Sequence, residues 1–157
     1  MQIVRQGDVP VVPVSAIPGS AKPIARDNGR IILAYGEVTG HAHALHGPGA
    51  TLLAGDDGAR YLAIAGEAHT TLRPVALLDP LDTDTIRVED ASGLILRLGR
   101  AAYEERVLKA LGATLTLPGE VLQHEEHDAI VLAPGNYRLP GQREYTSKDM
   151  APRRVAD

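Results

Sequence analysis

A chain of 157 residues, 44% of them hydrophobic, has the length and apolar content for one domain with a core, which excludes a disordered protein. It contains no cysteine, phenylalanine or tryptophan, so disulfides and thiolate metal ligands are excluded and aliphatic side chains must fill the core. The net charge of −4 and the scarcity of aromatic side chains argue against nucleic acid as a partner. No apolar run reaches membrane-spanning length and the N-terminus lacks a signal-peptide pattern, so we expect a cytoplasmic protein without a membrane partner.

The first third of the chain indicates short strands separated by turns. Residues 9–14 (VPVVPV) predict an extended segment at a sheet edge, because each proline lacks the N–H that a ladder needs. A long polar connection follows at 17–30, and then a strong strand at 30–38 (RIILAYGEV). That strand leads into a histidine-rich stretch, which a turn at 46–49 (HGPG) closes.

The middle of the chain predicts two hairpins and one helix. Residues 50–66 form the clearest hairpin, with the turn DDG between two apolar runs. Residues 85–99 predict a second hairpin around the sequence AS. Residues 99–113 have apolar side chains at helical spacing and a suitable C-terminal stop at Gly112, so we expect the only helix there.

The last third returns to strands, at 129–132 and 137–139 around the turn APGN, before a polar tail at 147–157. We therefore predict one mainly-β domain over residues 1–157, either a small barrel or a sandwich. It carries an inserted β-hairpin plus the helix.

Three stretches resemble a group of small, uncharacterised bacterial proteins: RQGDV near the start, GEVTGHAHAL, and HEEHDAIVLAPGNYR followed by QREYT and RRVAD. The resemblance covers about residues 1–65 and 120–157, and it implies no activity and no catalytic residues. It does imply that residues 67–119, which hold the predicted helix, are an insertion into a compact β-domain.

Five of the six histidines lie in two clusters far apart in the chain. His41 and His43 have the i, i+2 spacing that puts two side chains on one face of a strand, close enough to share a metal ion. Gly40 permits a bulge or a close backbone approach just before them. His46 would face the other side of a regular strand, and it reaches the same site if the chain turns at residues 46–48.

The second cluster, His124 and His127, lies in the polar sequence HEEHD, where we expect a turn that presents one or both imidazoles. Glu125, Glu126 and Asp128 add carboxylates to this turn. A carboxylate there can be a metal ligand or an acceptor that fixes a histidine tautomer.

Two glutamates are candidate catalytic residues. Glu37 precedes His41 by four residues, so on a strand it would share the face of His41 and His43. Glu126 in the second cluster is the other candidate for a general base. Whether the protein is an enzyme is left open, because no motif names a substrate or a reaction.

The arrangement is similar to the cupin family of small β-barrels, which hold a metal with an H-x-H pair, a nearby glutamate and a later histidine. His41 and His43 match the pair, and His124 or His127 matches the later position. The chain departs from the family pattern by placing His46 where a glutamate is expected and by lacking the second cupin motif. The resemblance implies a metal-dependent barrel.

We therefore predict a metal-binding β-protein, with ligands drawn from His41, His43, His46, His124 and His127. Nitrogen and oxygen donors without thiolates suit Zn, Fe, Mn or Ni. An open coordination position would permit a metal-dependent enzyme. The alternative is a non-catalytic assembly or interaction module that self-associates through β edges or the inserted segment, with structural or exposed histidines.

Overall fold

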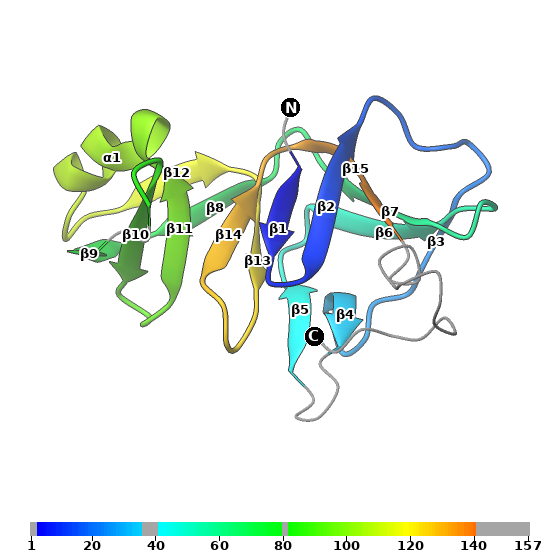
Figure 1. Cartoon of the computed structure of the whole chain (residues 1–157), viewed down its shortest axis with the longest axis horizontal. Helices are drawn as coiled ribbons and strands as arrows, with labels where there is room; N and C mark the ends of the chain where they lie inside the picture. The colour runs from blue at the N-terminus through cyan, green and yellow to red at the C-terminus, as the bar shows by residue number, and fades with distance from the viewer. Residues whose placement is uncertain (1–2, 36–40, 80–81, 141–157) are drawn as a thin grey trace.

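The computed structural model describes residues 3–35, 41–79 and 82–140, and in these ranges the fold is mainly β with one helix (Figure 1). The first eight strands are β1 Val4–Gln6, β2 Val9–Val14, β3 Lys22–Pro23, β4 Ile31–Tyr35, β5 Ala42–Leu45, β6 Ala50–Ala54, β7 Arg60–Ile64 and β8 His69–Leu72. The others are β9 Pro74–Leu78, β10 Thr85–Asp90, β11 Ile95–Gly99, β12 Leu115–Pro118, β13 Glu120–Gln123, β14 Ala129–Leu132 and β15 Gly135–Leu139, with α1 at Arg100–Lys109.

The strands form two large sheets and one small one. The six-stranded sheet has the order β1-β2-β15-β7-β6-β3, and the seven-stranded sheet has the order β4-β5-β13-β14-β11-β10-β9. Strands β12 and β8 pair separately, and no sheet closes into a barrel among the described strands. The predicted mainly-β fold is confirmed, and its arrangement is that of a sandwich. The described strands do not form the barrel that the cupin resemblance implied.

The main core lies between the two large sheets. Val11 of β2 and Leu62 of β7 come from one sheet, Leu45 of β5 and Leu122 of β13 come from the other, and all four are fully buried. Burial of apolar side chains from both sheets is what holds a sandwich together. Tyr137 is the one aromatic side chain in this core cluster.

A second apolar cluster lies at the other end of the seven-stranded sheet, under α1. It includes Val88 of β10, Leu96 of β11 and Val107 of the helix, all fully buried. Nearly all of its members come from the predicted insertion at 67–119. The insertion itself, like the single-domain assignment, stays a prediction.

The predicted hairpins and the helix are confirmed. Strands β6 and β7 pair antiparallel around the turn DDG, and β10 pairs antiparallel with β11. Helix α1 ends at Lys109 with Ala110 as its C-cap, and Gly112, two residues further on, adopts a left-handed φ of +79° that glycine tolerates. No helix in the described ranges is long and apolar enough to cross a membrane.

Two expectations need correction. Strand β2 is not at an edge, because it lies between β1 and β15. Residues 9–11 pair only with β1 and residues 12–14 pair only with β15, so each half of the strand has a paired neighbour on one side only. The prolines are tolerated because each lies in such a half, where an edge-like side needs no backbone N–H. The turn APGN is also shorter than expected, since β15 begins at Gly135 and joins the opposite sheet from β14. The predicted tail at 147–157 lies outside the described residues.

Candidate functional site

Four imidazole rings meet at one place in the fold, and we call them the histidine cluster: His41, His43, His124 and His127. The ring of His124 stacks on that of His43 with centroids 4.1 Å apart, lies 4.7 Å from that of His127, and meets that of His41 edge-on at 5.9 Å. The rings of His43 and His127 are 5.9 Å apart. The two predicted groups of histidines are therefore brought together across more than 80 residues of chain.

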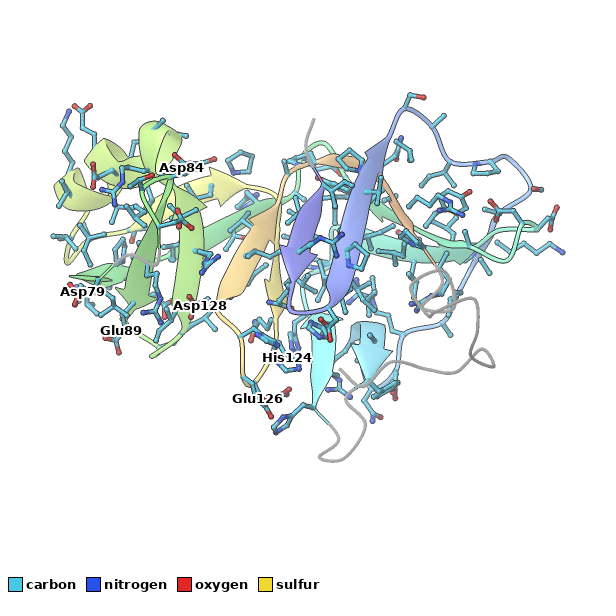
Figure 2. All side chains as sticks on the ribbon, viewed as in Figure 1. Asp79, Asp84, Glu89, His124, Glu126 and Asp128 are labelled. Carbon is cyan, nitrogen blue, oxygen red and sulfur yellow. The ribbon has the colours of Figure 1, made fainter. Side chains whose placement is uncertain are left out.

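Strand β5 positions the first histidine pair. Side chains alternate across a strand, so His43 points to the same face of β5 as Leu45, which is part of the main core. His43 has no exposed surface, and the partly exposed His41 lies just before the strand. Strand β13 pairs with β5, and the chain then turns at residues 124–128 before β14. Figure 2 shows His124 and Glu126 on this turn, beside the start of β5.

A buried glutamine fixes the orientation of His43. The Nε2 group of Gln6, 2% exposed, donates to the carbonyl oxygens of Leu122 at 2.9 Å and Asp128 at 3.1 Å. Both of its hydrogens are thus used, and its Oε1 lies 2.8 Å from Nδ1 of His43. An amide oxygen can only accept, so His43 donates from Nδ1, and a neutral His43 carries its ring lone pair on Nε2.

Carboxylates orient the other side of the cluster. Glu126 Oε1 lies 2.8 Å from Nδ1 of His41, which therefore donates to it. Glu125 accepts the backbone N–H of Ala42 at 3.0 Å. Partial burial alone would raise the pKa of Glu125. The bond from Ala42, a bond from its own backbone, and the nearby His41 and His124 together bring that pKa below its usual value.

In His124 the Nδ1 atom accepts a hydrogen bond, whereas in His41 and His43 it donates one. The Nδ1 of His124 accepts the backbone N–H of Glu126 at 3.0 Å, so a neutral His124 carries its proton on Nε2. His127, at the exposed end of the cluster, lies against Gly7 in the turn between β1 and β2. A Cβ at Gly7 would come within 2.6 Å of Nε2 of His127, and the φ of Gly7, +58°, is left-handed, which favours glycine.

The remaining candidates fall elsewhere. His46 is exposed at the end of β5 and makes no ring contact with the other described histidines. Glu37 lies outside the described residues. Within the described ranges, no three histidine or carboxylate side chains already converge as a ready-made metal site.

A pocket of about 250 Å³ adjoins the cluster, and we call it the arginine pocket. It shares Gln6, Gly7, Glu126 and His127 with the cluster's surroundings. Its other lining residues are Arg5, Arg87, Arg97, Asp128 and Ile130.

One carboxylate sits among the arginines. Asp128 accepts two hydrogen bonds from Arg87, at Nε (2.8 Å) and Nη2 (3.2 Å), which is the bidentate geometry of a strong pair. This bond and the charge of Asp128 raise the pKa of Arg87 above its usual value. From the sequence we expect Asp128 to support the histidines, but its side chain binds Arg87, and only its backbone oxygen joins the Gln6 network.

Comparison with known proteins identifies a region rather than an activity. A family model for a domain of unknown function, DUF8820, matches residues 5–76. The matched region holds Gln6, His41 and His43, while the turn with His124 and His127 lies beyond it. No curated protein and no solved structure matches the chain.

Sequence reasoning missed the residues that support the cluster. Gln6 stands in the stretch RQGDV, which the sequence marks only as part of the resemblance to small bacterial proteins. A polar residue directly before a glycine in a tight hairpin is a weak signal, and nothing local shows that its side chain is buried. Arg87 and Arg97 were missed because each looks like an ordinary exposed charge on an alternating strand.

Proposed function

We propose that this protein binds a divalent transition-metal ion at the histidine cluster, as a small metal-binding β-protein. The observation that carries the proposal is the meeting of four imidazole groups from two distant chain segments, with neighbouring ring centroids 4.1 to 5.9 Å apart. Imidazole nitrogen is a common ligand for such ions, and this chain has no thiolate to compete.

His41 and His43 are the best first ligands. Each donates from Nδ1 to an oxygen, Glu126 for His41 and Gln6 for His43, so in the neutral ring the lone pair is on Nε2. Metal-binding histidines typically use one ring nitrogen for the metal and donate the other N–H to a carboxylate or carbonyl. Glu126 therefore supports the site by orienting His41.

The third ligand is His127 or His124. His127 is exposed, so its ring can turn toward the cluster at little cost. His124 is buried, and its Nδ1 is bound to a backbone N–H, so it has to turn its ring before Nε2 can bind a metal. Because the donors do not yet converge, metal binding requires a small reorientation of at least one ring.

The donor set suits Zn, Fe, Mn or Ni. Three nitrogen ligands would leave a coordination position for water or a substrate, as in metal-dependent hydrolytic sites. An enzyme of this kind would need a general base. Of the two candidates, Glu37 lies outside the described residues, and Glu126 has a side chain that is 61% exposed.

The test is the metal content of the full chain purified without an affinity tag. After separate incubation with Zn²⁺, Fe²⁺, Mn²⁺ or Ni²⁺ and desalting, mass spectrometry of the metal should find about one ion per chain for at least one of them. The double variant His41→Ala/His43→Ala should retain less than about a tenth of that metal, because two of three ligands are gone.

The matched control is His46→Ala, which removes an exposed neighbouring histidine and should keep the full metal content. Wild-type protein that takes up none of the four metals would overturn the proposal. Equal loss of metal in the His46 variant and the double variant would also contradict it. In either case the alternative function, a non-catalytic assembly or interaction module, explains the protein better. Sedimentation of the metal-free chain then measures its self-association.

A further inference from the structure

The arginine pocket contains an unusual juxtaposition of like charges. Arg87 on β10 and Arg97 on β11 are direct cross-strand partners. Like charges placed opposite each other destabilise a sheet. Arg5, from β1, adds a third guanidinium to the same pocket.

Asp128 offsets only part of this charge. Its carboxylate is engaged by Arg87, and the Nε of Arg97 lies 3.8 Å from Asp128 Oδ2, beyond hydrogen-bond distance. That Nε is buried and has no hydrogen-bond partner in the described part of the chain. A buried N–H left without an acceptor costs free energy. The Arg97 side chain as a whole is 34% exposed, so its other N–H groups remain accessible to an acceptor from outside the chain.

Arg5 and Glu126, the other charged side chains in the pocket lining, do not form an ion pair with each other. Arg5 is exposed at the rim and makes no hydrogen bond or ion pair with the residues that the structure describes. Glu126, the second carboxylate of the lining, is bonded to His41. Arg5 and Arg97 thus make no hydrogen bond through their side chains with the described residues, and both line one small polar pocket.

We propose that the arginine pocket binds the carboxylate or phosphate group of a small molecule, with Arg97 and Arg5 as its donors. The planar guanidinium matches both oxyanions, because it can present two parallel N–H groups to two oxygens. A volume of about 250 Å³ is at or below the lower end of ligand pockets and limits the ligand to a few heavy atoms. The nearby Ile130 gives the pocket a small apolar surface.

The proposal stands without the metal, although an anion in this pocket would lie beside His127 and therefore next to the histidine cluster. Two of the three arginines, Arg87 and Arg97, come from the segment predicted to be an insertion. That segment therefore supplies one side of the pocket, and its strand β11 pairs with β14.

The test uses the full chain in an amine buffer that contains chloride and a chelator, so that metal binding plays no part. Inorganic phosphate, malonate and the neutral compound glycerol are titrated separately by isothermal calorimetry and by amide NMR shifts. We expect phosphate or malonate to bind, glycerol not to bind, and added salt to weaken the binding. Phosphate binding alone indicates a phosphorylated ligand, and malonate binding alone indicates a carboxylate ligand.

The variants Arg97→Gln and Arg5→Gln should each weaken the binding about tenfold or more, because each removes a charge-assisted hydrogen bond. The control Arg106→Gln removes an exposed arginine of α1 and should change affinity less than about twofold. If Arg97→Gln fails to fold, the rim variant Arg5→Gln still decides the question. Binding of neither anion, or equal binding in all variants, overturns the proposal, and neither outcome bears on the metal.

Discussion

Gln6 shows how one side chain can set the chemistry of its neighbours. It is buried, it donates to two backbone carbonyls, and it accepts from His43. It links the β1–β2 hairpin to strand β13, to the end of the β13–β14 turn and to strand β5. Because its hydrogens are committed, its oxygen is what decides which nitrogen of His43 carries the proton.

Replacement of Gln6 by leucine should lower the free energy of unfolding by about 2–3 kcal/mol, because it leaves the N–H of His43 and two carbonyl oxygens without their partner. Urea unfolding of wild type and variant measures the change. In long-range ¹⁵N–¹H spectra, wild-type His43 should show a protonated Nδ1, and the variant should lose that preference.

The control is Gln123→Leu on β13, a half-buried glutamine whose side chain makes no hydrogen bond with the described residues. It should change stability by less than about 0.5 kcal/mol. Equal destabilisation by the two variants would mean that Gln6 acts through its size and not through its hydrogen bonds.

At the scale of elements, the turn HGPG between β5 and β6 must pass very close to β13. A Cβ at Gly47 would lie 1.6 Å from Oε1 of Glu120, and one at Gly49 would lie 2.6 Å from the Cβ of Ala68. Glu120 is itself 4% exposed, so it has little room to move away. These glycines are required by contact, since neither has a left-handed φ.

Gly47→Ala should therefore destabilise the protein by about 1–3 kcal/mol through overpacking. Thermal and urea unfolding measure this loss. Adding Glu120→Ala to the same chain should recover part of it, because the colliding carboxylate is then absent.

The matched control is Gly66→Ala, in the loop between β7 and β8. Nothing lies within 4 Å of the Cβ it would add. Its effect should stay within about 0.5 kcal/mol. If Gly47→Ala proves as harmless as this control, the turn has more freedom than the close contacts imply.

At the scale of the whole molecule, the two candidate sites lie where the two apolar clusters meet. Strand β14 connects the two apolar clusters, since Ala129 belongs to the cluster under α1 while Ile130 and Leu132 belong to the main core. The turn before β14 carries His124, Glu126 and Asp128 (Figure 2). It brings the second histidine pair to the cluster and Asp128 to the arginines. A ligand at either site would thus tie distant parts of the chain together.

Metal binding should therefore raise the midpoint of thermal unfolding of the entire chain. A ligand present at about 100 times its dissociation constant adds about 2.7 kcal/mol if it binds only the folded state. For a chain of this length that corresponds to an increase of about 5–10 °C. Calorimetry with the metal that binds, and then with excess chelator, measures the increase and its reversal.

The variant His41→Ala/His43→Ala should show no such increase with the same metal. An equal increase in that variant would place the stabilising ion somewhere other than the histidine cluster.

The sequence by itself determined the local structure. Alternating apolar residues around DDG predicted the β6–β7 hairpin, and helical spacing followed by Gly112 predicted α1, because periodicity and turn chemistry act between near neighbours. It also identified the histidines of the cluster, since their clustering is visible along the chain.

Only the tertiary structure decided which segments lie side by side. It placed β2 inside a sheet, sent β15 to the sheet opposite β14, and excluded His46 from the ring contacts. It also buried Gln6 against His43 and set Arg87 opposite Arg97. These pairings depend on how strands far apart in the chain bury their apolar faces together, and no local pattern contains that information.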